Sequence, residues 1–151
     1  MTPELEQQLV KDFPNLFSDY GKDMKLTAMH WGCDVEDGWE PILRKACQKL
    51  EPLILDWVER NPNDLSFKPR FSQVKEKYGT LSIYWTSATD DMYSITDAAE
   101  TKSATTCEQC GKPGKLRGRG WVYTSCYTCA DPQDTDNLEF LELKYDEKQK
   151  K

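Results

Sequence analysis

The sequence predicts an α+β fold in which helices pack on a small antiparallel sheet and a cysteine-rich ribbon is appended to it. Apolar residues recur at helical spacing over residues 3–13 and 37–60, whereas residues 71–86 alternate between apolar and polar side chains. Two Cys-x2-Cys pairs near the C-terminal end predict the ribbon. We therefore expect three parts: a core domain at 1–104, a ribbon at 105–130 and a partly disordered C-terminal segment at 131–151.

Length and composition favour a compact, water-soluble protein. A chain of 151 residues can build one sizeable core, and no run approaches the roughly 20 apolar residues of a membrane-spanning helix. The acidic, helix-patterned N-terminus does not resemble a signal peptide. We expect a cytoplasmic protein that makes no contact with a membrane.

Charge is spread unevenly along the chain, whose net value is −6. Residues 1–100 carry −7 (11 Lys and Arg against 18 Asp and Glu), residues 101–130 carry +4 (five against one), and residues 131–151 carry −3 (four against seven). The acidic majority argues against nucleic-acid binding by the whole surface, but the basic ribbon leaves a local site open.

Two helices are predicted in the first 60 residues. Thr2 and Pro3 are typical of an N-cap and a first helical residue. The second helix is expected to start at Asp37, since Asp37 and Glu40 have capping-box spacing. Pro52 interrupts its apolar stripe, which predicts a kink or two abutting helices.

The remaining elements follow from shorter patterns. We expect a strand at Leu26–Trp31, a hairpin of strands 71–77 and 80–86, and a helix capped by Thr89. The inward face of that helix would comprise Met92, Ile95, Ala98 and Ala99. Residues 137–145 are compatible with a short helix or a strand, and the residues beyond them with a loose tail.

The four clustered cysteines predict one structural zinc ion. Cys-x2-Cys lets a tight turn present two sulfurs, and two such turns complete a tetrahedral S4 shell; the ligands would be Cys107, Cys110, Cys126 and Cys129. Two disulfides would need an oxidising compartment that nothing in the sequence indicates. An iron–sulfur cluster is the other alternative, but paired turns with a 15-residue insert favour zinc. A shell of four thiolates leaves no open position for catalysis.

Between the two cysteine pairs lies a basic, glycine-rich finger. It could contact phosphates or an acidic protein surface, or it could be a solvated hairpin tip; its cations are Lys112, Lys115, Arg117 and Arg119. Residues 112–119 are therefore the candidate partner-binding segment, for nucleic acid or for protein.

Catalytic candidates are few. His30 is the only histidine, and Cys33 three residues later could form a nucleophilic pair with it. The alternative is a structural histidine and a structural thiol. Cys47 falls on the apolar helix face and is expected in the core. The acidic residues near Asp37 do not fit a calcium loop, because Lys45 takes the twelfth position counted from Asp34.

Three stretches of the chain together resemble a family of small proteins that recurs in tailed bacteriophages and prophages. They are HWGCDVEDGWEPIL, FSQVKEKYGTLSIYW and CEQCGKPGKLRGRGWVYTSCYTCA. The resemblance implies a phage accessory protein that works in the bacterial cytoplasm, with host defences as one candidate target. It identifies no catalytic residues. We expect a non-catalytic protein that binds a host protein. The alternatives are a nucleic-acid-binding zinc ribbon and an enzyme that uses His30 and Cys33.

Overall fold

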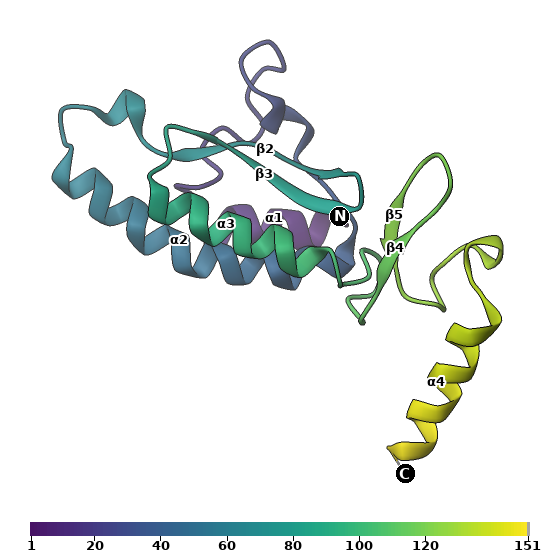
Figure 1. Cartoon of the computed structure of the whole chain (residues 1–151). Coiled ribbons are helices and arrows are strands. Elements are labelled where there is room, and N and C mark those ends of the chain that lie inside the picture. The colour runs from purple at the N-terminus through teal and green to yellow at the C-terminus, as the bar shows by residue number, and fades with distance from the viewer. Residues whose placement is uncertain (151) are drawn as a thin grey trace.

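The computed structural model describes residues 1–150 and confirms an α+β fold. Three helices form one layer beneath a small sheet, and a second hairpin and a last helix follow at one end (Figure 1). The helices are α1 (Pro3–Asp12), α2 (Glu40–Arg60), α3 (Asp90–Ser103) and α4 (Asn137–Gln149); the strands are β1 (Cys33–Asp34), β2 (Arg70–Lys77), β3 (Thr80–Thr86), β4 (Lys115–Arg117) and β5 (Tyr123–Ser125). Short 3-10 turns lie at Ala28–Trp31, Asp37–Trp39, Leu65–Phe67 and Pro132–Asp134.

The main sheet has the order β1-β2-β3. The predicted hairpin is confirmed: β2 and β3 are antiparallel, and their connecting residues Tyr78 and Gly79 both have positive φ, at 51° and 84°. Such values suit the tight turns that match the twist of a hairpin. β1 joins β2 in parallel, with Cys33 opposite Val74. The sheet is therefore mixed, and the sequence did not predict its parallel edge.

The hydrophobic core lies between the sheet and the helices. Its largest fully buried side chain is Trp39, which precedes α2. Cys47 on α2 is also fully buried, as predicted. Around them pack Leu9, Leu16, Met29, Leu43, Leu50, Ile54, Phe71, Val74 and Leu81.

The predicted strand at Leu26–Trp31 is wrong. Residues Ala28–Trp31 form a 3-10 turn, and the Thr27 hydroxyl caps it by accepting a hydrogen bond from the Met29 amide at 3.1 Å. Among the large apolar side chains of this stretch only Met29 is buried, whereas Leu26 and Trp31 are exposed, so the alternation expected of a strand is absent. Gly32, with φ of 70°, then turns the chain into β1.

The start of α2 also differs from the prediction. Asp37 does not cap the helix; its carboxylate accepts from the Thr2 amide at 2.7 Å, which ties the N-terminus to this turn. Glu40 pairs with Arg44 at 2.7 Å instead of reaching back to the cap. A 3-10 turn comes first, so α2 begins three residues later, and it runs as a single helix through Pro52 rather than as two.

The last two helices, α3 and α4, each begin just after a residue whose side chain caps the first turn. The Thr89 hydroxyl accepts from the Met92 amide at 3.5 Å at the start of α3, as predicted. Ala98, expected to face inward, is exposed. Residues 137–149 adopt the helical alternative, and Asp136 caps α4 by accepting from the Glu139 amide at 2.8 Å. Helix α4 extends beyond the predicted end of the element and points away from the core (Figure 1).

Candidate metal centre

Two similar turns hold the four clustered cysteines. In the first, the Gly111 amide donates to the Cys107 carbonyl at 2.9 Å. In the second, the Ala130 amide donates to the Cys126 carbonyl at 3.1 Å. Gly111 has φ of 79°, a conformation that glycine adopts without steric cost. The short hairpin of β4 and β5 joins the two turns and brings them face to face.

The sulfur atoms lie where one tetrahedral ion would place them. All four Sγ atoms lie within 4.8 Å of one another, and Cys110 Sγ and Cys126 Sγ are 3.6 Å apart. Four Zn–S bonds of about 2.3 Å give a tetrahedron with sulfur–sulfur edges of about 3.8 Å. The four cysteines are free, and 3.6 Å is far longer than the roughly 2.05 Å of a disulfide. The structure thus confirms a four-cysteine site able to hold a metal ion.

The thiols of this site differ in how readily they ionise. Burial opposes ionisation of Cys107, but backbone amides of Cys126, Cys110 and Gln109 outweigh it and lower its pKa to about 6. Burial and hydrogen bonding to the neighbouring sulfurs raise the pKa of Cys129 to about 12. The backbone of the first turn therefore favours the thiolate form of Cys107. Four thiolates held this close repel one another, so the site needs a cation among them.

Hydrogen bonds from buried groups dock the ribbon on the core. The Trp39 indole donates to the Thr106 carbonyl at 2.8 Å, and the Thr124 hydroxyl donates to the Gly79 carbonyl at 2.6 Å. The Gly38 amide donates to the Glu108 carbonyl at 2.6 Å. A Cβ at Gly38 would lie 2.3 Å from the Cys107 carbonyl oxygen, so only glycine permits this approach. The first cysteine turn therefore rests directly on the 3-10 turn Asp37–Trp39, which precedes α2.

Arg117, one of the four predicted partner-binding cations, is buried and already engaged. Its side chain donates to the Ser125 carbonyl at 2.9 Å and to the Asp134 carbonyl at 3.0 Å. It also makes a two-pronged ion pair with Glu139 on α4, one prong of which is 2.8 Å long. Its guanidinium therefore fastens α4 to the ribbon and does not face a partner.

The other three cations of the finger remain exposed. Lys115 lies 3.5 Å from Glu139, whereas Lys112 and Arg119 make no ion pair within residues 1–150. The hairpin tip beyond Arg119 projects from the ribbon (Figure 1), and Trp121 on it is 81% exposed. Trp31 is also exposed, although tryptophan is usually buried for much of its surface. Sequence composition alone gave no sign of which tryptophans would face solvent.

The structure does not pair His30 with Cys33. The exposed His30 ring contacts the Lys22 carbonyl through Nδ1 at 2.9 Å, and no hydrogen bond joins it to Cys33 in the described part of the chain. Cys33 is 3% exposed, and burial, with the nearby Glu6 charge, raises its pKa to about 12. A buried neutral thiol without a base is a poor nucleophile. The acidic residues near Asp37 likewise form no cluster suited to a metal within residues 1–150.

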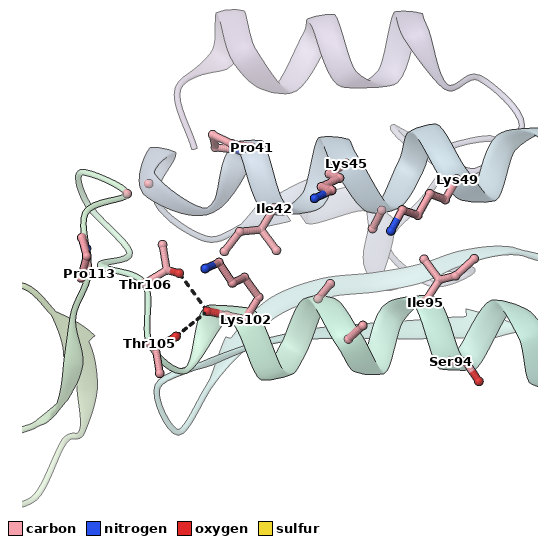
Figure 2. A pocket seen from close by; sticks show the side chains of 15 residues that line it. Pro41, Ile42, Lys45, Lys49, Ser94, Ile95, Lys102, Thr105, Thr106 and Pro113 are labelled. Atoms are coloured by element: carbon pink, nitrogen blue, oxygen red, sulfur yellow. Dashed lines mark hydrogen bonds between the residues drawn. The ribbon is translucent and has the colours of Figure 1, made fainter.

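A groove of about 730 Å³ between α2 and α3 was not foreseen from the sequence. Figure 2 shows Lys45 and Lys49 on α2 and Lys102 on α3 directed toward it, above apolar side chains. One end reaches the first cysteine turn at Gly111. Its apolar floor includes Ile95, Ala98 and Ala99, which the sequence predicted to face inward, but periodicity alone does not show that a groove stays open above them.

Comparison with protein-family models, curated proteins and solved structures finds no match. Within residues 1–150, no helix combines the length and the apolar character needed to cross a membrane. The phage resemblance, the cytoplasmic location and the partners remain predictions from the sequence.

Proposed function

We propose that this chain is a non-catalytic binding protein whose ribbon is closed by one zinc ion. The sulfur spacing supports a single ion, because all four Sγ atoms lie within 4.8 Å of one another, whereas a cluster of several irons and sulfides would hold thiolates on different irons further apart. Cys107, Cys110, Cys126 and Cys129 would hold the ion, which supplies folding energy rather than chemistry. Elemental analysis should find about one zinc per chain; stoichiometric iron, in one centre or a cluster, would contradict this assignment.

The observation that supports protein binding is a projecting loop with exposed apolar side chains. The segment between α1 and β1 stands out from the sheet (Figure 1), and its Met24, Leu26 and Trp31 are 54%, 78% and 68% exposed. Tryptophan and methionine are enriched at protein interfaces, and tryptophan is among the residues that supply most of the binding energy there. If the chain is phage-encoded, as the resemblance implies, the partner is a host protein.

Pull-down from bacterial lysate, with and without nuclease, tests this proposal. We expect a captured protein that resists nuclease and is lost from the double variant Leu26→Ser, Trp31→Ala. The matched control is Leu65→Ser, Phe67→Ala, two side chains of similar exposure (53% and 62%) in another loop. Equal capture by both variants would show that the projecting loop does not form the interface.

A second candidate function is nucleic-acid binding at the hairpin tip, favoured by the exposed Trp121 beside Arg119. An exposed indole can stack on a base, and the three exposed cations of the finger, Lys112, Lys115 and Arg119, can contact phosphates. Three contacts to duplex DNA would give a salt slope of at most about −2.7. Mobility shifts at about 0.1 M salt test this function. Submicromolar binding that Trp121→Ala and Arg119→Glu abolish would make it the leading function.

A further inference from the structure

We propose that α4 of a second copy of this chain occupies the groove between α2 and α3, so that two chains form a reciprocal dimer. Both surfaces are exposed in the single chain, and they complement each other in length, apolar character and charge.

The groove offers an apolar floor with a basic rim. Its floor consists of Ile42, Ala46, Ile95, Ala98 and Ala99. Lys45 and Lys49 stand on the α2 side and Lys102 on the α3 side, and none of the three makes an ion pair within residues 1–150. No acidic side chain is among the lining residues. From Pro41 to Lys49 the groove follows α2 for about 12 Å, at 1.5 Å per residue.

Helix α4 has two opposite faces with different surroundings. One face is held by its own ribbon: Glu139 pairs with Arg117, and the Phe140 ring lies 6.0 Å from that of Tyr127. The opposite face carries Leu138, Leu141 and Tyr145, which are 72%, 61% and 64% exposed. These three residues, spaced by three and four, form a stripe about 10 Å long, which matches the groove.

The charges on the two surfaces also have matching spacing. Lys45 and Lys49 are one helical turn apart on α2, and Glu142 and Asp146 are one turn apart beside the apolar stripe of α4. Neither acid makes an ion pair within its own chain, among the residues described. Placing the two lysines of α2 against the two acids of α4 forms two ion pairs at once. Because both pairs form only when the helices are aligned in this way, they define the register of docking.

Helix handedness fixes the direction of docking. Suppose that α4 lies in the groove parallel to α2, with its apolar stripe against the groove floor. Because the helix is right-handed, Glu142 and Asp146 then face α2. The opposite flank, with Lys148, then faces α3 near its acidic first turn, where Asp91 lies one turn before Ser94. The antiparallel direction would place the lysine flank of α4 against the lysines of α2. We therefore assign the parallel arrangement.

The occupant is a second copy because α4 is already fastened in its own chain. The Arg117–Glu139 pair holds the start of α4 on the ribbon, and the helix points away from the core (Figure 1). The free face can meet another molecule without breaking this attachment. Two-fold symmetry makes the contact twice, which doubles the buried area toward the roughly 1,200 Å² or more of a specific interface.

Light scattering on the zinc-loaded full chain tests the proposal. At about 100 µM protein, we expect twice the 17.5 kDa mass of one chain. The double variant Lys45→Glu, Lys49→Glu should weaken dimerisation at least about tenfold, and so should Glu142→Lys, Asp146→Lys. Combining all four changes should restore the dimer, because the ion pairs are then reversed rather than lost. The control Lys11→Glu, Lys25→Glu makes the same change in net charge at exposed sites elsewhere and should leave the dimer intact.

A measurement on the unaltered protein covers variants that fail to fold. A zero-length carbodiimide crosslinker should join Lys45 to Glu142 and Lys49 to Asp146, and mixed light and heavy isotope-labelled chains should show that these links connect different molecules. A monomer at this concentration, links within one molecule only, or a dimer indifferent to both charge reversals would overturn the proposal. Because none of these readouts involves a host protein, failure of the proposed function would leave the result unaffected.

Discussion

The core and the ribbon of this molecule are stabilised in different ways. The core buries a continuous set of apolar side chains around Trp39. The buried side chains of the ribbon are instead two cysteines and several polar residues: Thr106, Cys107, Arg117, Thr124, Ser125 and Cys126. Hydrophobic burial needs no ligand, whereas a set of polar side chains and thiolates depends on hydrogen bonds and a cation. The core and the ribbon should therefore respond differently to metal removal, substitution and pH.

Metal removal should separate the core from the ribbon most strongly. Structural zinc contributes about 10–16 kcal/mol in zinc-finger peptides, so chelation or Cys107→Ser should unfold residues 105–130. We expect most of the far-ultraviolet circular dichroism to survive, because α1, α2 and α3 belong to the apolar core. A complete loss of that signal would show that the core cannot stand without the ribbon.

Substitutions in the core should lower the free energy of unfolding whether or not they change the affinity for zinc. Leu50→Ala removes a fully buried side chain and should lower the free energy of unfolding by about 3 kcal/mol with little change in zinc affinity. Trp39→Phe should lower it by about 2 kcal/mol, through lost volume and the lost hydrogen bond to Thr106.

The two substitutions should differ in their effect on the ribbon. Only Trp39→Phe should also weaken zinc binding, because Thr106 adjoins the ligand Cys107. Competition with a chromogenic chelator measures this difference, and equal zinc affinities in the two variants would mean that the docking bond does not support the metal centre.

Loss of the Arg117 side-chain charge should have a moderate effect. Arg117→Met keeps the chain length but leaves Glu139 without its partner, so we expect a loss of about 2 kcal/mol in ribbon stability and release of α4. The control Lys115→Met removes the weaker, exposed partner and should cost less than about 0.5 kcal/mol. Hydrogen exchange in α4 reports the difference, and equal protection in both variants would refute the role given to Arg117.

The smallest effect concerns pH. The Arg117 hydrogen bonds hold the pKa of Glu139 below its usual value of 4.5. A carboxylate with a lowered pKa stabilises the fold above its unfolded pKa, and this contribution disappears as pH falls through the folded value. Exchange protection of α4 should therefore fall below about pH 4 more steeply in the native chain than in Glu139→Gln. Identical pH profiles would show that the Arg117–Glu139 ion pair does not stabilise α4.

Much of the fold could be predicted because it depends on local pattern. The alternation over residues 71–86 identifies a hairpin, and Tyr78-Gly79 supplies the turn that it requires. The same holds for the cysteine site, because ligand spacing within each turn is set by a few adjacent residues and only the pairing of the turns is remote. The Thr89 cap is equally local.

Contacts between distant segments decided the rest. Asp37 has the spacing of a helix cap, yet its carboxylate receives the Thr2 amide instead. Arg117 lies in a run of exposed cations, but Glu139, 22 residues later, withdraws it from solvent. The α2–α3 groove exists only because two helices pack side by side. Sequence spacing determines which side chains share an element, whereas the approach of remote elements determines which of them a partner can reach.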